Sequence, residues 1–127
     1  MQLTFPYVEK GGVFYPVVDF ILFGKKTSLS VSALVDSGAS FSIFRPEIAE
    51  YLEIDIENGK SFFLEGVGGR ILGYLHNVPV QVGEKRFDCK MVFSREFTVS
   101  FNLVGRNNFF QQFIVTFNEK QKQLILH

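Results

Sequence analysis

The feature that most restricts the fold of this chain is an alternation of apolar and polar residues with a period of two. Successive side chains of a β-strand point to opposite faces, so the alternation predicts strands with one buried face. The two clearest apolar series are Leu29, Val31, Ala33 and Val35, and Phe87, Cys89, Met91 and Phe93. A mainly β fold is therefore predicted.

Turn residues divide these strands into hairpins. Glycine-containing turns join adjacent strand-like runs in three places, and a turn that starts at Asn118 joins a fourth pair. The predicted pairs are residues 17–23 with 27–35, 61–65 with 70–74, 78–82 with 85–93, and 113–117 with 123–126. Helix signals are confined to residues 47–52, with Pro46 in the first turn, and to one or two turns within 107–112. These elements predict a small closed or nearly closed β-barrel with one or two short helices.

Length and charge narrow the possible functions. A chain of 127 residues can bury its own core, and we expect one domain over residues 1–127, complete because it starts at Met1. Lysine plus arginine and aspartate plus glutamate both number 13, and no basic run stands out. We therefore expect no nucleic-acid partner, because phosphate binding needs clustered positive charge.

Cysteine, histidine and apolar content bear on location and cofactors. Cys89 is the only cysteine, so no internal disulfide can form, and we expect a cytoplasmic protein. The longest apolar segment, residues 13–23, is interrupted by Pro16 and Asp19, so no membrane span is expected. Two histidines and a lone cysteine make no plausible zinc site, and we expect neither a metal nor another cofactor.

The segment with the clearest chemical content is Asp36-Ser37-Gly38, which follows the apolar run 33–35 directly. A carboxylate at the end of a buried strand is costly unless something uses it. Gly38 permits a tight turn and the close approach of another chain. Taken alone, the tripeptide is also good chemistry for an ordinary turn that ends a strand.

A second motif changes that interpretation. The sequence Asn102-Leu103-Val104-Gly105-Arg106-Asn107 lies downstream, and the glycine-rich hairpin around Gly68 and Gly69 lies between the two motifs. Together, Leu34-Val35-Asp36-Ser37-Gly38-Ala39-Ser40, the glycine-tipped hairpin and the later motif resemble the retropepsin-like aspartic proteases. The resemblance extends over about residues 17–126 and suggests a single-domain cellular member.

The resemblance implies a role for each matched residue. In this family the aspartate of the first motif is catalytic, the following hydroxyl joins the two loops of a dimer, and the glycine brings N–H groups to the carboxylates. The implied catalytic residues are Asp36, Ser37 and Gly38, where many members carry threonine in place of Ser37. The implied substrate-binding residues are Ala39, Ser40, Val67, Gly68, Gly69 and Val104, of which residues 67–69 belong to a flap over the cleft. Leu103, Gly105 and Arg106 are the implied structural support of the site.

This chemistry needs two carboxylates that share one proton, one acting as base toward water and the other as acid. The other aspartates, Asp19, Asp55 and Asp88, lack the hydroxyl and glycine that follow Asp36. A homodimer would supply the second Asp36 across a twofold axis. We therefore expect a homodimeric aspartic endopeptidase that acts on a peptide or protein substrate.

Two other functions remain open from the sequence. The fold could serve as a peptide-binding or dimerisation module with little turnover. The chain could also be an unrelated small β-barrel that binds a ligand, with Asp36-Ser37-Gly38 as a plain turn. Peptidase activity that is lost when Asp36 is replaced by asparagine would distinguish the peptidase from the binding module. Two Asp36 carboxylates that meet across a twofold axis between subunits would distinguish both of these from the unrelated barrel.

Overall fold

The computed structural model of the chain describes residues 1–66 and 69–127. Most of these residues lie in strands, so the mainly β class is confirmed. The strands are β1 (Leu3–Pro6), β2 (Val8–Lys10), β3 (Val13–Tyr15), β4 (Val17–Phe23), β5 (Ser28–Val35), β6 (Ser42–Phe44), β7 (Lys60–Gly66), β8 (Gly69–Val82), β9 (Lys85–Phe93), β10 (Asn102–Val104), β11 (Val115–Asn118) and β12 (Gln123–Leu126). The helical elements are α1 (Pro46–Tyr51) and the short 3-10 turns η1 (Ile56–Asn58) and η2 (Phe110–Gln112).

The main sheet has seven strands in the order β4-β5-β10-β6-β9-β8-β7. Strand β4 also pairs with β8, where Ile21 and Leu22 lie opposite Gln81 and Val80. That additional pairing closes β4, β5, β10, β6, β9 and β8 into a ring. Strand β7 lies outside the ring and pairs with the first half of β8, from Gly69 to Leu75. The core fills this ring and includes the fully buried Phe44, Phe93 and Phe109.

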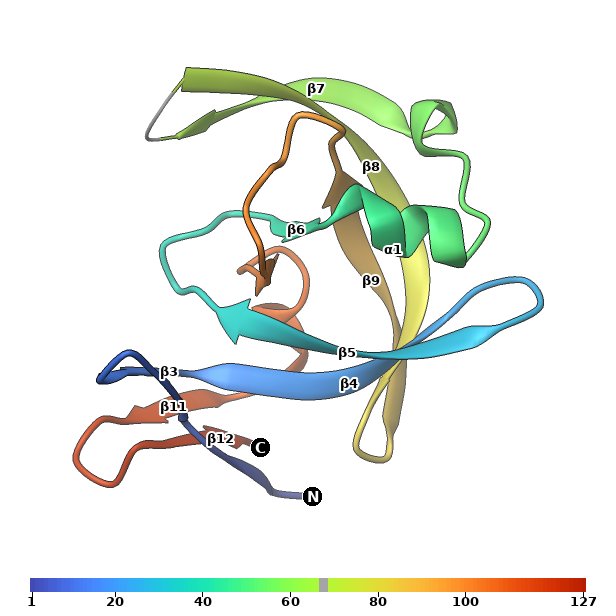
Figure 1. The fold of residues 1–127 in the computed structure, drawn as a ribbon. Coiled ribbons are helices and arrows are strands. Elements are labelled where there is room, and N and C mark those ends of the chain that lie inside the picture. Colours follow the sequence, from blue (N-terminus) through green and yellow to red (C-terminus); the bar gives the residue numbers. More distant parts are fainter. Residues whose placement is uncertain (67–68) are drawn as a thin grey trace.

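Two smaller sheets flank the ring. Strands β1, β12 and β11 form one of them, so the two ends of the chain pair with each other. Strands β2 and β3 form a two-stranded hairpin. In Figure 1 the hairpin of β7 and β8 lies at the top, both termini lie at the bottom, and the loop after β5 opens between them on the left.

Three of the four predicted hairpins match in their pairing. The register of β7 and β8 sets Ser61 opposite Tyr74 and Glu65 opposite Arg70, as predicted. Strands predicted at 70–74 and 78–82 are parts of one continuous strand, β8, because β9 extends the pairing as far as Tyr74. The fourth hairpin starts later than predicted, at Val115 in β11.

The helical predictions were less accurate. Helix α1 has Pro46 in its first turn, as predicted, because the fixed backbone angle of proline suits that position, but it ends at Tyr51, one residue before the predicted end. The helical stretch predicted at 107–112 is reduced to η2, because Asn107 forms a bridge with Phe41. No helix in residues 1–66 or 69–127 has the length and apolar character that a membrane crossing needs.

Candidate active site

Asp36 lies at the point where strand β5 leaves the sheet. Its main-chain N–H donates to the carbonyl of Val104 at 3.0 Å, while the N–H of Val35 donates to the carbonyl of Pro16 at 2.9 Å. These bonds hold the end of β5 between β10 and the start of β4. The half-buried Asp36 is therefore placed by its own strand and by two segments that are distant from it in sequence.

The loop after Asp36 is a tight turn that orients the carboxylate. The N–H of Gly38 donates to Oδ1 of Asp36 at 2.9 Å, and the N–H of Ala39 donates to its carbonyl at 3.2 Å. Ser37 and Gly38 are exposed at the surface of the loop, beside that carboxylate.

Strand β10 carries the second motif directly against the first. It runs parallel to β5, with Leu103 opposite Leu34 and Val104 opposite Val35. On its other side, Leu103 pairs antiparallel with Ile43 of β6. Strand β10 therefore fills the space between the strand that enters the Asp36 loop and the strand that leaves it.

Gly105 and Arg106 continue this contact along the loop. The N–H of Arg106 donates to the carbonyl of Ala39 at 2.9 Å, and the N–H of Asn107 donates to that of Ser40 at 2.8 Å. A Cβ atom at Gly105 would lie 2.4 Å from the carbonyl oxygen of Phe41, so no other residue fits without moving the loop. The Arg106 side chain is exposed and, within the described part of the chain, makes no ion pair.

Two buried polar residues support the site and were missed by the sequence interpretation. The hydroxyl of Ser42 accepts the N–H of Gly105 at 3.0 Å. The amide of Asn102 accepts the N–H of Arg45 at 2.9 Å and donates to the carbonyl of Ser32 at 3.1 Å. Asn102 opens the second motif, but nothing in the sequence signals that its side chain bridges two other segments.

The β7–β8 hairpin, which we call the flap hairpin, reaches toward the Asp36 loop. The ring of Phe62 in β7 packs against that of Phe41, with centroids 5.3 Å apart. Gly69 begins β8 with a φ of 114°, which favours glycine. Val67 and Gly68, predicted to contact substrate, lie outside the described residues.

One surface hollow borders the Asp36 loop at Ser40, and another lies beside β5 with no residue of that loop in its lining. The first, of about 390 Å³, is lined by Ser40, Arg106, Asn107, Phe110 and Gln111. The second, of about 430 Å³, is mainly apolar. It is lined by Val8, Lys10, Tyr15, Val17, Ser32, Ala33, Leu34, Ser100 and Phe101.

Other reactive side chains are engaged elsewhere in the fold. Cys89 is buried, and this burial raises the pKa of its thiol to about 12. His76 packs against the Phe93 ring, and its Nε2 lies 2.8 Å from the carbonyl oxygen of Ile56. These contacts give both side chains structural roles away from Asp36.

Comparisons with known proteins agree with the geometry. A family model described as aspartyl protease matches residues 21–107. DNA damage-inducible protein 1 of Candida glabrata is 40% identical over 65 residues, which are 49% of this chain and 15% of that protein. The chain thus spans only a small part of this relative's length.

Solved structures share the fold at low sequence identity. A retropepsin-like aspartic protease from Rickettsia conorii matches with a TM-score of 0.73 and 18% identity, over 99% of this chain and 98% of that one. EIAV protease, solved with the inhibitor HBY-793, matches with a TM-score of 0.60 and 18% identity, over 83% of this chain and 93% of that one. The family match includes both the Asp36 loop and the β10 motif, and the chain belongs to the aspartyl protease family, with a retropepsin-like fold.

Proposed function

We propose that this protein is an aspartic endopeptidase whose single active site is formed by two Asp36 carboxylates, one from each subunit of a homodimer. The observation that carries the proposal is the Asp36 loop itself. Its carboxylate accepts the N–H of Gly38 and is backed by β10, in a chain that belongs to the aspartyl protease family.

The need for a dimer follows from the chemistry. Two close carboxylates in a poorly hydrated cleft cannot both ionise cheaply, so they share one proton and titrate as a pair. The ionised member accepts a proton from water, and the protonated member donates to the carbonyl oxygen of the peptide bond. One chain supplies one such aspartate, and a twofold axis beside the loop would supply the other.

The remaining residues take supporting roles in this proposal. Ser37 joins the two loops across the axis, and Leu103, Gly105 and Arg106 hold the loop in place. Ala39, Ser40 and the flap residues 67–69 border the substrate, whereas Val104, implied by the resemblance as a further substrate contact, is fully buried and backs the loop from the core. The apolar hollow beside β5 supports a preference for apolar side chains in an extended peptide.

The test is the isosteric variant Asp36→Asn. It removes the charge and keeps the shape, so we expect folded, dimeric protein with at least about a hundredfold less peptide hydrolysis. Circular dichroism and sedimentation would check the fold and the dimer, and a peptide library would supply substrates. Wild-type turnover by this variant would show that Asp36 is not catalytic, whereas peptide binding without turnover by the wild type would favour a binding module.

A further inference from the structure

The flap hairpin loses one of its neighbours at a definite point in the sheet. Strand β9 pairs with β8 from Val82 opposite Lys85 up to Tyr74 opposite Phe93. Continued by two residues, this register would set Leu72 opposite Arg95. The chain turns instead, with the N–H of Phe97 donating to the carbonyl of Ser94 at 3.2 Å. Beyond Tyr74, β8 therefore keeps only β7 as a strand partner.

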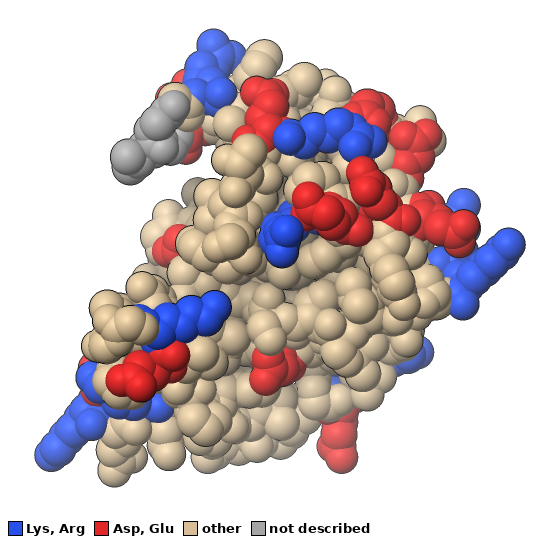
Figure 2. All heavy atoms as spheres, in the orientation of Figure 1, with Lys and Arg blue, Asp and Glu red and all other residues tan. Residues whose placement is uncertain are grey.

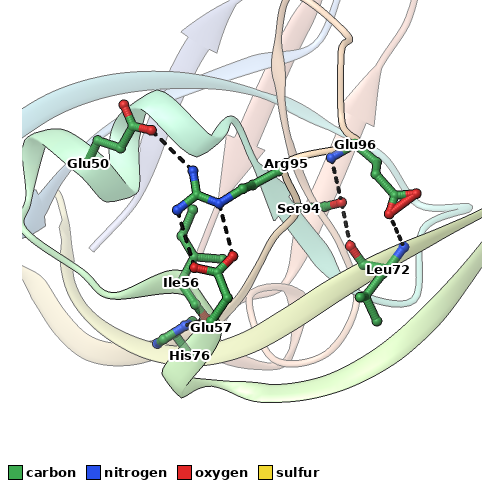
Figure 3. Close-up of polar contacts among 8 residues, drawn as sticks. All are labelled: Glu50, Ile56, Glu57, Leu72, His76, Ser94, Arg95 and Glu96. Atoms are coloured by element: carbon green, nitrogen blue, oxygen red, sulfur yellow. Dashed lines mark hydrogen bonds and ion pairs between the residues drawn. The ribbon is translucent and has the colours of Figure 1, made fainter.

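Two side chains replace the missing main-chain bonds at Leu72 (Figure 3). The hydroxyl of Ser94 donates to the carbonyl of Leu72 at 2.5 Å, and the N–H of Leu72 donates to Oε2 of Glu96 at 3.1 Å. A hydrogen-bonded antiparallel pair exchanges these same two bonds through main-chain groups. Ser94 is fully buried, and its hydroxyl also accepts the N–H of Glu96 at 3.1 Å.

Arg95, which lies between these two residues, anchors the turn to the body of the fold. Its Nε lies 2.9 Å from Oε2 of Glu57 in η1, and its Nη1 lies 3.3 Å from Oε1 of Glu50 in α1. Figure 2 shows acidic and basic side chains gathered over α1 and the base of the flap hairpin. Each exposed pair is weak, but together they tie the turn to two elements outside the flap hairpin.

The position of these contacts divides the flap hairpin. On the body side, Gly73 packs so closely that an added Cβ would lie 2.5 Å from Cγ1 of Val92. On the tip side, Leu64 to Gly66 pair only with Gly69 to Ile71. Along β8 toward the hairpin tip, Leu72 is thus the last described residue whose main-chain N–H and C=O are bonded to the rest of the protein on the side away from β7.

We propose that Ser94 and Glu96 form a clamp on Leu72, and that this clamp sets the point about which the flap hairpin bends over bound peptide. This inference rests on the proposed peptidase function, and it makes Ser94 and Glu96 positioning residues. Without the clamp, the flap hairpin spends more time away from the cleft. Because binding then draws on a smaller population of closed protein, the apparent affinity for substrate falls while the chemical step is unchanged.

The test compares Glu96→Ala with Glu96→Gln, which keeps an acceptor oxygen, and with Glu84→Ala, which deletes the same charge at the exposed turn between β8 and β9. In Glu96→Ala we expect faster amide hydrogen exchange at Leu72 and in residues 63–66 and 69–71, with unchanged exchange in residues 78–82. We also expect KM to rise about fivefold, with kcat within about twofold of wild type. Glu96→Gln should keep both the exchange rates and KM close to those of the wild type. Glu84→Ala should match the wild type in both measurements.

Two results would overturn the clamp: exchange at Leu72 that is the same in Glu96→Ala and Glu84→Ala, or faster exchange with unchanged KM. The exchange measurement needs no activity. If the wild type hydrolyses no peptide, the peptidase proposal fails, while unchanged exchange at Leu72 would still reject the clamp and faster exchange would still support it.

Discussion

At the scale of single residues, Asp36 depends on main-chain groups more than on side chains. Its carboxylate accepts the N–H of Gly38, and its own N–H is bonded to Val104. Ala39 follows, with a methyl group where a serine or threonine would place a hydroxyl next to the carboxylate. The working pH of the proposed pair is therefore open to adjustment at this one position.

We predict that Ala39→Ser lowers the pH at which activity is lost on the alkaline side. A hydroxyl that donates to the Asp36 carboxylate stabilises its charged form, so the shared proton leaves at lower pH. The measurement is a pH–rate profile of peptide hydrolysis, which should be bell-shaped. Ala39→Val, which adds bulk without a donor, is the control. An alkaline limb that stays in place or moves upward in Ala39→Ser would reject this account of the working pH.

Tyr7 gives a second prediction, which concerns stability. Burial raises the pKa of its phenol from the ordinary 10.0 to about 12, and the hydrogen bond to Glu119, at 2.5 Å, acts in the same direction. The folded state therefore holds a proton that the unfolded state releases above pH 10. The resulting stabilisation is complete below that pH and is lost as pH rises through about 12.

We expect the free energy of unfolding of the wild type to fall with pH more steeply than that of Tyr7→Phe between about pH 10 and 12. Chemical denaturation at a series of pH values measures both slopes. Tyr51→Phe, at an exposed position, should follow the wild type. Equal slopes in wild type and Tyr7→Phe would show that this hydroxyl is not linked to folding.

At the scale of elements, the close contact between Gly105 and the Asp36 loop matters most. A Cβ at Gly105 would meet the main chain of Phe41 and Ala39, which cannot rotate away as a side chain can. We predict that Gly105→Ala lowers the free energy of unfolding by about 1–3 kcal/mol and reduces peptidase activity with it. Thermal and urea unfolding measure the loss.

Gly38→Ala is the matched comparison, because its Cβ would meet only the Asp36 carboxylate oxygen, at 3.3 Å. That variant should keep nearly the stability of the wild type and lose activity. If Gly105→Ala were as stable as Gly38→Ala, the packing of β10 against the loop would be looser than the structure indicates.

Elements were predictable where local pattern and turn chemistry agree. The hairpin of β4 and β5 could be predicted from two signals, the alternation in residues 28–35 and the turn at Gly24. Both signals lie within one stretch of chain. Strand β10 gave no such signal. No strand was predicted at its three residues, and they form one because β5 and β6 lie on either side of them.

At the scale of the whole molecule, local patterns in the sequence could not predict most contacts between distant segments. Strand β1 pairs with β12 at the other end of the chain, and each strand has only four residues. Ser42 and Asn102 support the site from buried positions that only the assembled sheet creates. The resemblance implied that the two motifs lie against each other, as the bond from the Asp36 N–H to Val104 shows, but it did not imply the polar side-chain contacts that hold them.

The central claim, that one active site needs Asp36 from two subunits, is tested most directly by mixing wild-type protein with Asp36→Asn at equal amounts under subunit exchange. Each dimer with one altered subunit has one carboxylate and should be inactive. If both kinds of subunit pair equally, about a quarter of dimers keep two carboxylates, so activity should fall to about a quarter of that of the same total amount of wild type. Activity of about half would mean that each chain works with its own Asp36 alone, and would contradict the account.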